Sequence, residues 1–414
     1  MAELRPVRGT RDFLPEDSRR RRHIEDTAFR CAEAYGFGEV STPILEYTNV
    51  FARTLGDTSD IVTKEMYTFD DRSGDSVTMR PENTAGIVRA FITNKLGQQL
   101  PLKVLYRGPM FRYERPQKGR LRQFHQIGVE CLGIADPVAD IEVISLAADI
   151  LTALGLADTI QLEINTLGDT ASRDAYRSEL VTYLEKHVDG LSEDSRRRLH
   201  ANPLRILDSK NPGDKAIVAG APPMTASLTA DSESFFRRVL NGLDTLGIPY
   251  RVNTRLVRGL DYYCHTTFEF VTDALGAQGT VLAGGRYDGL VEQMGGPPTA
   301  GVGWAAGVER LMMLVSEVPP MRRPVVVLPL GEDQIDAALV VTRKLRQRGV
   351  ITDCATGGSI ARRMKWANRI QARYVVILGA DEVARQSAAL RNMDSGDQEE
   401  LALADIANRL ATLT

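Results

Sequence analysis

The sequence lacks a long hydrophobic run, a secretory leader and any paired cysteine motif. No apolar stretch approaches the roughly 20 residues that a membrane span needs. Residues 1–6 contain no apolar segment of the kind found in a signal peptide. The four cysteines are scattered and form no CxxC pair, which argues against a structural zinc site and a disulfide framework. We therefore expect a cytoplasmic protein without a membrane partner.

An excess of positive charge is also missing. The chain has 51 Lys and Arg against 54 Asp and Glu, a net charge of −3, which by itself does not favour a nucleic-acid partner. A ligand as large as tRNA needs only a local basic face, however. Basic residues gather at 19–22, 112–122, 196–198 and 362–365. A solvated surface is the ordinary explanation of any one such cluster.

The length of 414 residues predicts two or three domains at about 150 residues each. With 25% charged and 43% hydrophobic residues, the composition is typical of a soluble globular protein. Pro319, Pro320 and Pro324 predict a linker after a first domain over residues 1–320. The pattern that follows predicts strands at 325–329, 352–354 and 374–378, with helices at 334–348 and 360–370 between them. This alternation predicts a separate small α/β domain over residues 324–414.

Within the first domain, residues 15–35 and 137–154 are predicted to be helices, each with proline near its start and glycine after its end. Between them, strands are expected over residues 104–114 and 122–132, joined by a basic loop as a long hairpin. The segment from about 169 to 244 is helical in pattern and weakly amphipathic, so we expect an insertion between β segments.

The predicted hairpin carries a stripe of polar residues on one face. Arg112 and Glu114 project from the first strand, and Gln126 and Glu130 project from the second, because alternate residues of a strand share a face. The planar fork of an arginine on such a face suits a phosphate. A surface Arg–Glu pair is the simpler alternative, but it explains two residues and not the whole stripe.

Three further segments place polar residues or glycines among apolar ones. Residues 78–86 hold Glu82 and Thr84 at a strand-to-helix junction, where a helix cap is the alternative explanation. Residues 256–263 and 283–289 combine arginine and tyrosines with glycines that permit close approach of a ligand. Residues 301–310 form a glycine-rich strand that runs into a helix, with Arg310 in its first turn.

These blocks, in this order, resemble the motifs of class II aminoacyl-tRNA synthetases, and more narrowly bacterial histidyl-tRNA synthetases. Residues 111–126 resemble motif 2, and residues 303–310 resemble motif 3. RGLDYY at 258–263 and AGGRYDG at 283–289 resemble the two histidine-specific segments. The resemblance implies an α+β fold: an antiparallel-sheet catalytic domain flanked by helices, a helical insertion and a C-terminal α/β anticodon-binding domain.

The family joins histidine to ATP as histidyl-adenylate and then transfers histidine to the 3′ end of its tRNA. The resemblance implies that Arg258 holds the α-phosphate and the histidine carboxylate, replacing a metal ion that other class II enzymes use. It implies that Arg112 binds the α-phosphate from the opposite side. The other implied contacts to ATP come from Glu114, Arg120, Phe124, which stacks on adenine, and Arg310. Mg²⁺ is expected between the phosphate oxygens.

For the amino acid, the resemblance implies that Glu82, Thr84 and Gln126 receive the α-ammonium group. Glu130 and Tyr263 are expected to read the imidazole nitrogens, and Tyr262 to line the pocket. Asn83 belongs to the same subsite, although it stands where the bacterial family more often has glycine. This departure leaves the geometry of the loop around Glu82 open.

The partners implied are histidine tRNA and a second copy of the chain. The hairpin tip, with Arg115 and Gln117, is expected to meet the acceptor end of the tRNA. The last domain should bind the anticodon, with phosphate contacts expected from Arg362, Arg363 and Lys365. Motif 1, near residues 43–53, builds the homodimer interface of the family.

Two rival interpretations remain open at this point. A catalytically inactive paralogue that binds histidine and regulates histidine biosynthesis would share the fold. Such paralogues generally lack the last domain and erode the RGLDYY segment, whereas this chain keeps both. A different class II synthetase is disfavoured by the two histidine-specific blocks.

Overall fold

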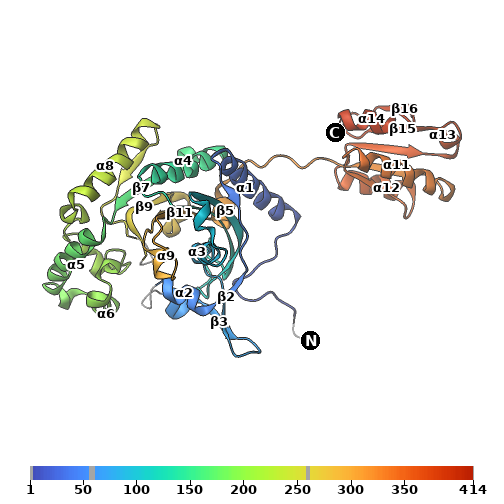
Figure 1. Cartoon of the computed structure of the whole chain (residues 1–414). Helices are drawn as coiled ribbons and strands as arrows, with labels where there is room; N and C mark the ends of the chain where they lie inside the picture. Colours follow the sequence, from blue (N-terminus) through green and yellow to red (C-terminus); the bar gives the residue numbers. More distant parts are fainter. Residues whose placement is uncertain (1–2, 56–60, 258–261, 414) are drawn as a thin grey trace. The chain divides into compact units, whose positions relative to one another are not determined.

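The computed structural model describes residues 3–55, 61–257 and 262–413. It forms two compact units, residues 1–318 and residues 319–414, which are described separately (Figure 1). Within the described residues, no helix has both the length and the apolar character needed to cross a membrane.

An eight-stranded sheet forms the centre of the first unit, with strand order β1-β5-β6-β11-β10-β9-β7-β8. The six strands from β5 to β7 in this order are antiparallel, whereas β1 and β8 pair in parallel at the two edges. This mixed α+β arrangement confirms the predicted class of fold. The strands are β1 (Gly38–Glu39), β5 (Leu102–Phe111), β6 (Gln123–Leu132), β7 (Gln161–Thr166), β8 (Tyr250–Val252), β9 (Cys264–Val271), β10 (Thr280–Arg286) and β11 (Gly301–Gly307).

One face of this sheet is covered by helices. They are α1 (Pro15–Ala34), α4 (Val138–Ala153), α8 (Ala230–Thr245) and α10 (Val308–Leu314). Buried side chains of these helices, such as Ile24 and Val239, share one apolar core with Phe268 and Trp304 of the sheet. The indole N–H of Trp304 donates to the carbonyl of Val143 at 2.8 Å, which ties α4 to the sheet.

The opposite face carries shorter elements. They are α2 (Thr48–Leu55), α3 (Thr84–Thr93), α9 (Leu290–Gln293) and a three-stranded sheet of β2 (Leu45–Tyr47), β4 (Ser76–Met79) and β3 (Tyr67–Asp70). Figure 1 shows α3 and α9 on this side of the strands. A second apolar core lies here and includes Tyr262, Tyr263 and Tyr287.

The chain between β7 and β8 is helical. It contains α5 (Thr170–Glu185), α6 (Glu193–Ala201), α7 (Pro212–Val218) and then α8. Asp169 caps α5 by accepting hydrogen bonds from the Ser172 N–H at 2.8 Å and from the Thr229 hydroxyl at 2.7 Å. Because Thr229 is itself the N-cap of α8, one carboxylate joins the starts of both helices.

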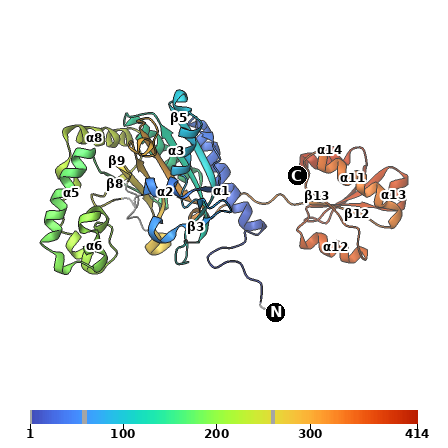
Figure 2. The same ribbon diagram turned by 60° about the horizontal axis from the view of Figure 1, so that its bottom comes forward.

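The second unit is a five-stranded sheet with helices on both faces, as Figure 2 shows. Helices α11 (Ile335–Gln347) and α14 (Ile406–Leu413) pack on one face, and α12 (Ile360–Arg369) packs on the other. The order is β13-β12-β14-β15-β16, with the last two strands antiparallel. The remaining elements are β12 (Val325–Pro329), β13 (Thr352–Cys354), β14 (Tyr374–Leu378), α13 (Ala380–Ala384), β15 (Ser387–Asn392) and β16 (Gln398–Ala402).

Candidate active site

A row of residues across four strands forms the floor of the site. Glu130 lies opposite Gly303, Gly303 opposite Gly285, and Gly285 opposite Thr267. Directly opposed residues share a face of the sheet, so the two glycines leave room on this face for the Glu130 carboxyl and the Tyr263 ring. A Cβ on Gly303 would lie 1.9 Å from Glu130 Oε2, and a Cβ on Gly285 would lie 2.8 Å from a ring carbon of Tyr263. Neither position therefore has room for a side chain, and both require glycine.

Glu130 stands at one end of this floor and is held by two hydroxyl groups. The Thr84 hydroxyl donates to Oε1 at 2.7 Å, and the Tyr287 hydroxyl donates to Oε2. Glu130 is only 1% exposed, and this burial raises the pKa of its carboxyl to about 8. The carboxyl is therefore largely protonated at neutral pH in the free protein.

This raised pKa predicts a pH-dependent stability. A carboxyl group whose pKa is higher in the folded than in the unfolded protein stabilises the fold while it is protonated. For Glu130 this contribution is complete below the unfolded pKa near 4.5, and it is lost as the pH rises through about 8. Between these values the free energy of unfolding should fall by up to about 1.4 kcal/mol per pH unit. We expect the melting temperature of the wild type to fall relative to that of Glu130→Gln between pH 6 and pH 9. If the difference between the two melting temperatures stays constant over that range, the pKa of Glu130 is not raised in the folded protein.

Glu82 lies at the start of α3. Its carboxylate accepts hydrogen bonds from the backbone N–H groups of Thr84 at 2.7 Å and Ala85 at 3.0 Å. Burial raises the pKa of Glu82, and these two hydrogen bonds oppose the rise. The capping function considered from the sequence is therefore present, and the Thr84 hydroxyl links the cap to Glu130.

The Asn83 side chain is directed elsewhere. Its Oδ1 accepts hydrogen bonds from the Thr42 hydroxyl at 2.7 Å and from Arg80 Nη1 at 3.3 Å. The backbone φ of Asn83 is −121°, so the position does not need the conformational freedom of glycine. Asn83 therefore braces the loop that presents Glu82, and its side chain does not join those of Glu82 and Glu130.

Gln126 lies on the same face of β6 as Glu130, four residues away. Its Oε1 is buried and has no hydrogen-bond partner among the described residues. Gly128 lies between the two, and a Cβ there would lie 2.4 Å from the Tyr106 hydroxyl oxygen. A polar group of a bound ligand could satisfy the Gln126 oxygen.

Guanidinium groups gather beyond the end of the hairpin strands. Arg112 Nε donates to the Pro81 carbonyl at 2.8 Å, and its guanidinium lies 5.3 Å from the centre of the Phe124 ring. Arg120 pairs with Glu114 at 3.2 Å, and Arg310 Nε donates to the Gly119 carbonyl at 3.2 Å.

These arginines are close enough to repel one another. Burial, and then the charges of Arg120 and Arg112, lower the pKa of Arg310, while Glu114 opposes the shift. Three cations near two carboxylates, Glu114 and Glu269, leave an excess of positive charge that suits a polyphosphate.

The hairpin is shorter than the sequence predicted. Strand β5 ends at Phe111 instead of residue 114, and β6 begins at Gln123. A local hydrogen bond from the Glu114 N–H to the Arg112 carbonyl, at 2.8 Å, turns the chain there. Arg112 and Glu114 thus lie just beyond the strand, although the Arg112 N–H still pairs with the Arg122 carbonyl.

Tyrosines close the other side of the floor. The rings of Tyr262 and Tyr263 lie 4.6 Å apart, and that of Tyr287 lies 5.8 Å from Tyr262. Tyr287 was not assigned from the sequence, although it stands in the AGGRYDG block that the sequence singled out. Arg258, with the rest of 258–261, lies outside the described residues.

Comparisons with known proteins agree with this geometry. A family model described as histidyl-tRNA synthetase matches residues 9–311, and an anticodon-binding domain model matches residues 324–413. The chain belongs to the histidyl-tRNA synthetase family. It is therefore an aminoacyl-tRNA synthetase, a class II enzyme that catalyses a ligation.

Curated relatives and a solved structure cover the whole chain. The chain is 58% identical to the histidine–tRNA ligase of Rhodospirillum rubrum, with 99% of each chain covered. It is 55% identical to that of Gluconacetobacter diazotrophicus, with 100% of each covered. The apo histidyl-tRNA synthetase of Staphylococcus aureus superimposes with a TM-score of 0.85 at 34% identity, covering 99% of this chain and 100% of the other. Because these relatives are histidine–tRNA ligases over their whole length, they do not favour the interpretation of this chain as a regulatory paralogue.

Other charged residues of this synthetase brace the scaffold. Arg286 of the AGGRYDG block forms an ion pair with Asp140 in which both side chains are fully buried, tying β10 to α4. His125 Nδ1 lies 2.9 Å from Glu309 Oε1, and its Nε2 lies 2.8 Å from Arg21. These residues hold the sheet against its helices and do not join the groups around Glu130.

Arg115 and Gln117 are exposed at the hairpin tip of the synthetase. A turn with Gly119 at a φ of +74° lets the Gln117 N–H donate to the Arg120 carbonyl at 3.1 Å. The structure thus keeps these two residues at the surface, apart from the buried residues of the floor.

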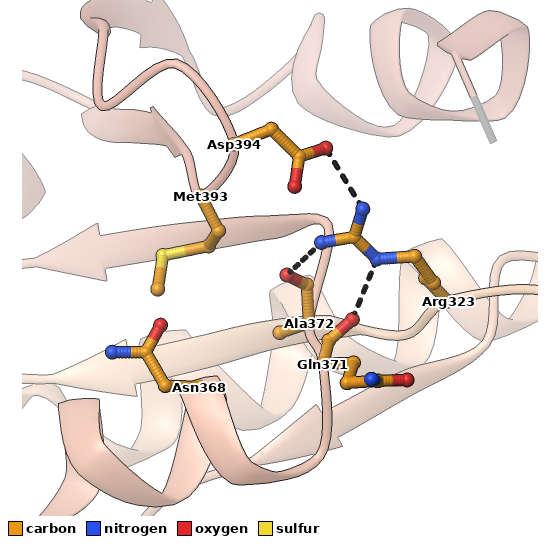
Figure 3. Close-up of a pocket in the computed structure, with 6 residues that line it drawn as sticks. All are labelled: Arg323, Asn368, Gln371, Ala372, Met393 and Asp394. Carbon is orange, nitrogen blue, oxygen red and sulfur yellow. Dashed lines mark hydrogen bonds and ion pairs between the residues drawn. The ribbon is translucent and has the colours of Figure 1, made fainter.

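The second unit of the synthetase contains a cavity of about 390 Å³ beside the Arg323 side chain. Arg323 donates to the carbonyls of Gln371 at 2.8 Å and Ala372 at 3.0 Å, and pairs with Asp394 at 2.8 Å (Figure 3). Its guanidinium group ties the start of the second unit to the sheet. The cavity is lined by none of the residues predicted for the active site.

Arg363 differs from its predicted role in binding tRNA phosphates. It is only 9% exposed, and its guanidinium donates to the carbonyls of Pro329 and, at 3.1 Å, Ala355. Arg362 and Lys365, on the same helix α12, are exposed. The period of an α-helix turns Arg363 toward the sheet, so this arginine stabilises the fold.

Proposed function

We propose that this chain activates L-histidine with ATP, releasing pyrophosphate, and transfers histidine from histidyl-adenylate to the 3′ end of histidine tRNA. The observation that carries the proposal is the buried Glu130 carboxyl, which lies over the glycine floor and is oriented by two hydroxyl groups. A buried polar group of this kind selects a ligand that can hydrogen-bond to it and rejects an apolar ring of similar size.

Histidine is proposed to lie on the floor between Glu130 and Tyr263, whose polar groups read the two imidazole nitrogens. Tyr262 lines the same pocket, packed against Tyr263. The α-ammonium group is received by the carboxylate of Glu82 and by the hydroxyl and amide oxygens of Thr84 and Gln126. The unpartnered, buried Oε1 of Gln126 supports this assignment. Asn83 contributes by bracing the loop through Thr42.

ATP is proposed to bind at the arginine group. Arg112 holds the α-phosphate, and Arg258 holds it from the other side together with the histidine carboxylate. Arg120 and Arg310 contact the outer phosphates, Glu114 fixes the nucleotide, and adenine stacks on Phe124. Cations already in place where charge develops on the α-phosphate lower the barrier to adenylation.

Mg²⁺ is proposed to arrive with ATP and to bridge its phosphate oxygens. No group of three or more His, Cys, Asp and Glu side chains able to hold a metal ion occurs in the described part of the chain. That composition suits an ion held mainly by substrate phosphates and water, as Mg²⁺ commonly is.

The tRNA is proposed to contact both units. Arg115 and Gln117 at the exposed hairpin tip meet the acceptor end, and the second unit, which matches an anticodon-binding model, takes the anticodon. We further propose that the enzyme acts in the cytoplasm, in keeping with its four unpaired cysteines.

A homodimer is proposed through the region of residues 43–53. Large apolar side chains are exposed there and on β3 of the same three-stranded sheet: Ile44 at 40%, Leu45 at 48%, Tyr47 at 59% and Phe69 at 47%. Apolar groups gathered on a small sheet are typical of a covered interface. Light scattering coupled to size-exclusion chromatography should give twice the mass of the chain. A stable monomer would contradict the proposal.

Charging of tRNA tests the proposed function directly. Purified protein, ATP, Mg²⁺ and bacterial tRNA should transfer labelled histidine, and none of the other amino acids, to the acid-insoluble fraction. If a folded protein binds histidine but transfers none of it, the proposal fails and the regulatory paralogue gains support.

A further inference from the structure

The segment that carries Tyr263 is tied to the rest of the chain by a hydrogen bond on each side. On the side that leads in, Asn165 Nδ2 of β7 donates to the Leu256 carbonyl at 2.9 Å. On the side that leads out, Arg173 Nη1 of α5 donates to the Tyr263 carbonyl at 2.8 Å. Asn165 belongs to the central sheet, whereas Arg173 belongs to the helical insertion.

Arg173 sits at a firmly held point of the insertion, in the first turn of α5. The Asp169 cap joins that turn to α8, as described above. Backbone hydrogen bonds from the His265 N–H to the Gly168 carbonyl, at 2.8 Å, and from the Leu167 N–H to the His265 carbonyl, at 2.7 Å, join the start of α5 to β9. The Arg173 backbone is therefore fixed relative to the sheet that carries the floor.

A cavity of about 270 Å³ lies where Arg173 reaches Tyr263. Val257 and Tyr263 line one side of it, and insertion residues including Arg173, Arg177 and Leu204 line the other. Arg173 Nε is buried and has no hydrogen-bond partner among the described residues. The hydrogen bond from Arg173 thus fixes the Tyr263 carbonyl at the edge of this cavity, where side chains of the insertion and of the catalytic domain meet.

We propose that Arg173 is a positioning residue for histidine activation, acting on the substrate through Tyr263. By holding the Tyr263 carbonyl, Arg173 sets the distance between the tyrosine ring, which stands over Gly285, and the Glu130 carboxyl at the other end of the floor. The helical insertion thereby supports the specificity pocket directly. This inference rests on the proposed role of Tyr263 in reading the imidazole.

The test is steady-state ATP–pyrophosphate exchange with Arg173→Ala in the full-length protein. We expect the KM for histidine to rise about tenfold and the KM for ATP to stay within about twofold, as for the loss of one charge-assisted hydrogen bond. Arg173→Lys keeps a donor and should recover most of the loss. In a Tyr263→Phe background, Arg173→Ala should have a smaller effect, because both changes act on one contact.

Arg177→Ala is the matched control. Arg177 lies one turn further along α5 and lines the same cavity, but it donates to the His200 carbonyl within the insertion, at 2.6 Å. It should leave both KM values near those of the wild type. If Arg173→Ala fails to fold, Arg173→Met, which keeps the stem and removes the donors, takes its place.

Three outcomes overturn the inference: equal effects of the Arg173 and Arg177 variants, equal losses for histidine and ATP, or an additive double variant. Each of these presupposes histidine-dependent exchange by the wild type. If the wild type itself shows no such exchange, it is the proposed function that fails.

Discussion

Replacing Glu130 by glutamine is expected to raise the KM for histidine about 100-fold and to leave the KM for ATP within about threefold. The carboxyl is buried and accepts hydrogen bonds from Thr84 and Tyr287. An amide has only one acceptor oxygen, so its NH₂ group must face one of these donors or the imidazole. This mispairing of polar groups weakens the binding of histidine and lies outside the proposed ATP site.

Glu163→Gln is the matched control for this variant. Glu163 is a buried glutamate of the same sheet, but it pairs with Arg251 and accepts a hydrogen bond from Asn253, away from the floor. Its replacement should leave the KM for histidine unchanged. If Glu130→Gln weakens the use of histidine and ATP equally, Glu130 does not read the imidazole.

Replacing Arg112 by alanine is expected to lower the kcat of histidine-dependent exchange by about 10²- to 10³-fold, the usual cost of removing one preorganised group that stabilises transition-state charge. The Arg112 guanidinium is held by the Pro81 carbonyl and lies over Phe124, so it needs no reorganisation when charge develops on the α-phosphate. Single-turnover formation of the adenylate measures the loss at the chemical step.

Arg122→Ala provides the comparison for Arg112→Ala on the same hairpin. Arg122 stacks on Tyr113 at 3.8 Å and donates to the Glu114 carbonyl at 3.1 Å, so it supports the loop without facing the phosphate site. Its loss should slow exchange far less. Similar losses in the two variants would mean that Arg112 acts by supporting the loop.

Period-two alternation and apolar runs made much of the architecture predictable. The polar stripe of β6 was read correctly because Gln126 and Glu130 must share a face of any strand. Strands β12, β13 and β14 begin and end at the predicted residues. By contrast, β15 and β16 were not predicted. Most of β16 is polar and exposed, and it gains its stability from pairing with β15.

The details of the site depend on contacts between distant segments, which local patterns do not encode. The hydrogen bond from Tyr287 to Glu130 joins residues 157 positions apart, and it follows from the register of β6, β11 and β10. The burial of Arg286 depends on Asp140 in α4. The end of β5 at Phe111 has a different cause: a local turn there outweighs the alternation of the sequence.

The central claim is that this site makes an adenylate from histidine and ATP. Exchange of labelled pyrophosphate into ATP, measured with purified protein, Mg²⁺ and each amino acid in turn, tests it most directly. We expect rapid exchange that requires histidine and is absent with the other amino acids. A folded protein that binds histidine without exchange, or exchange driven equally by another amino acid, would contradict the formation of histidyl-adenylate at this site.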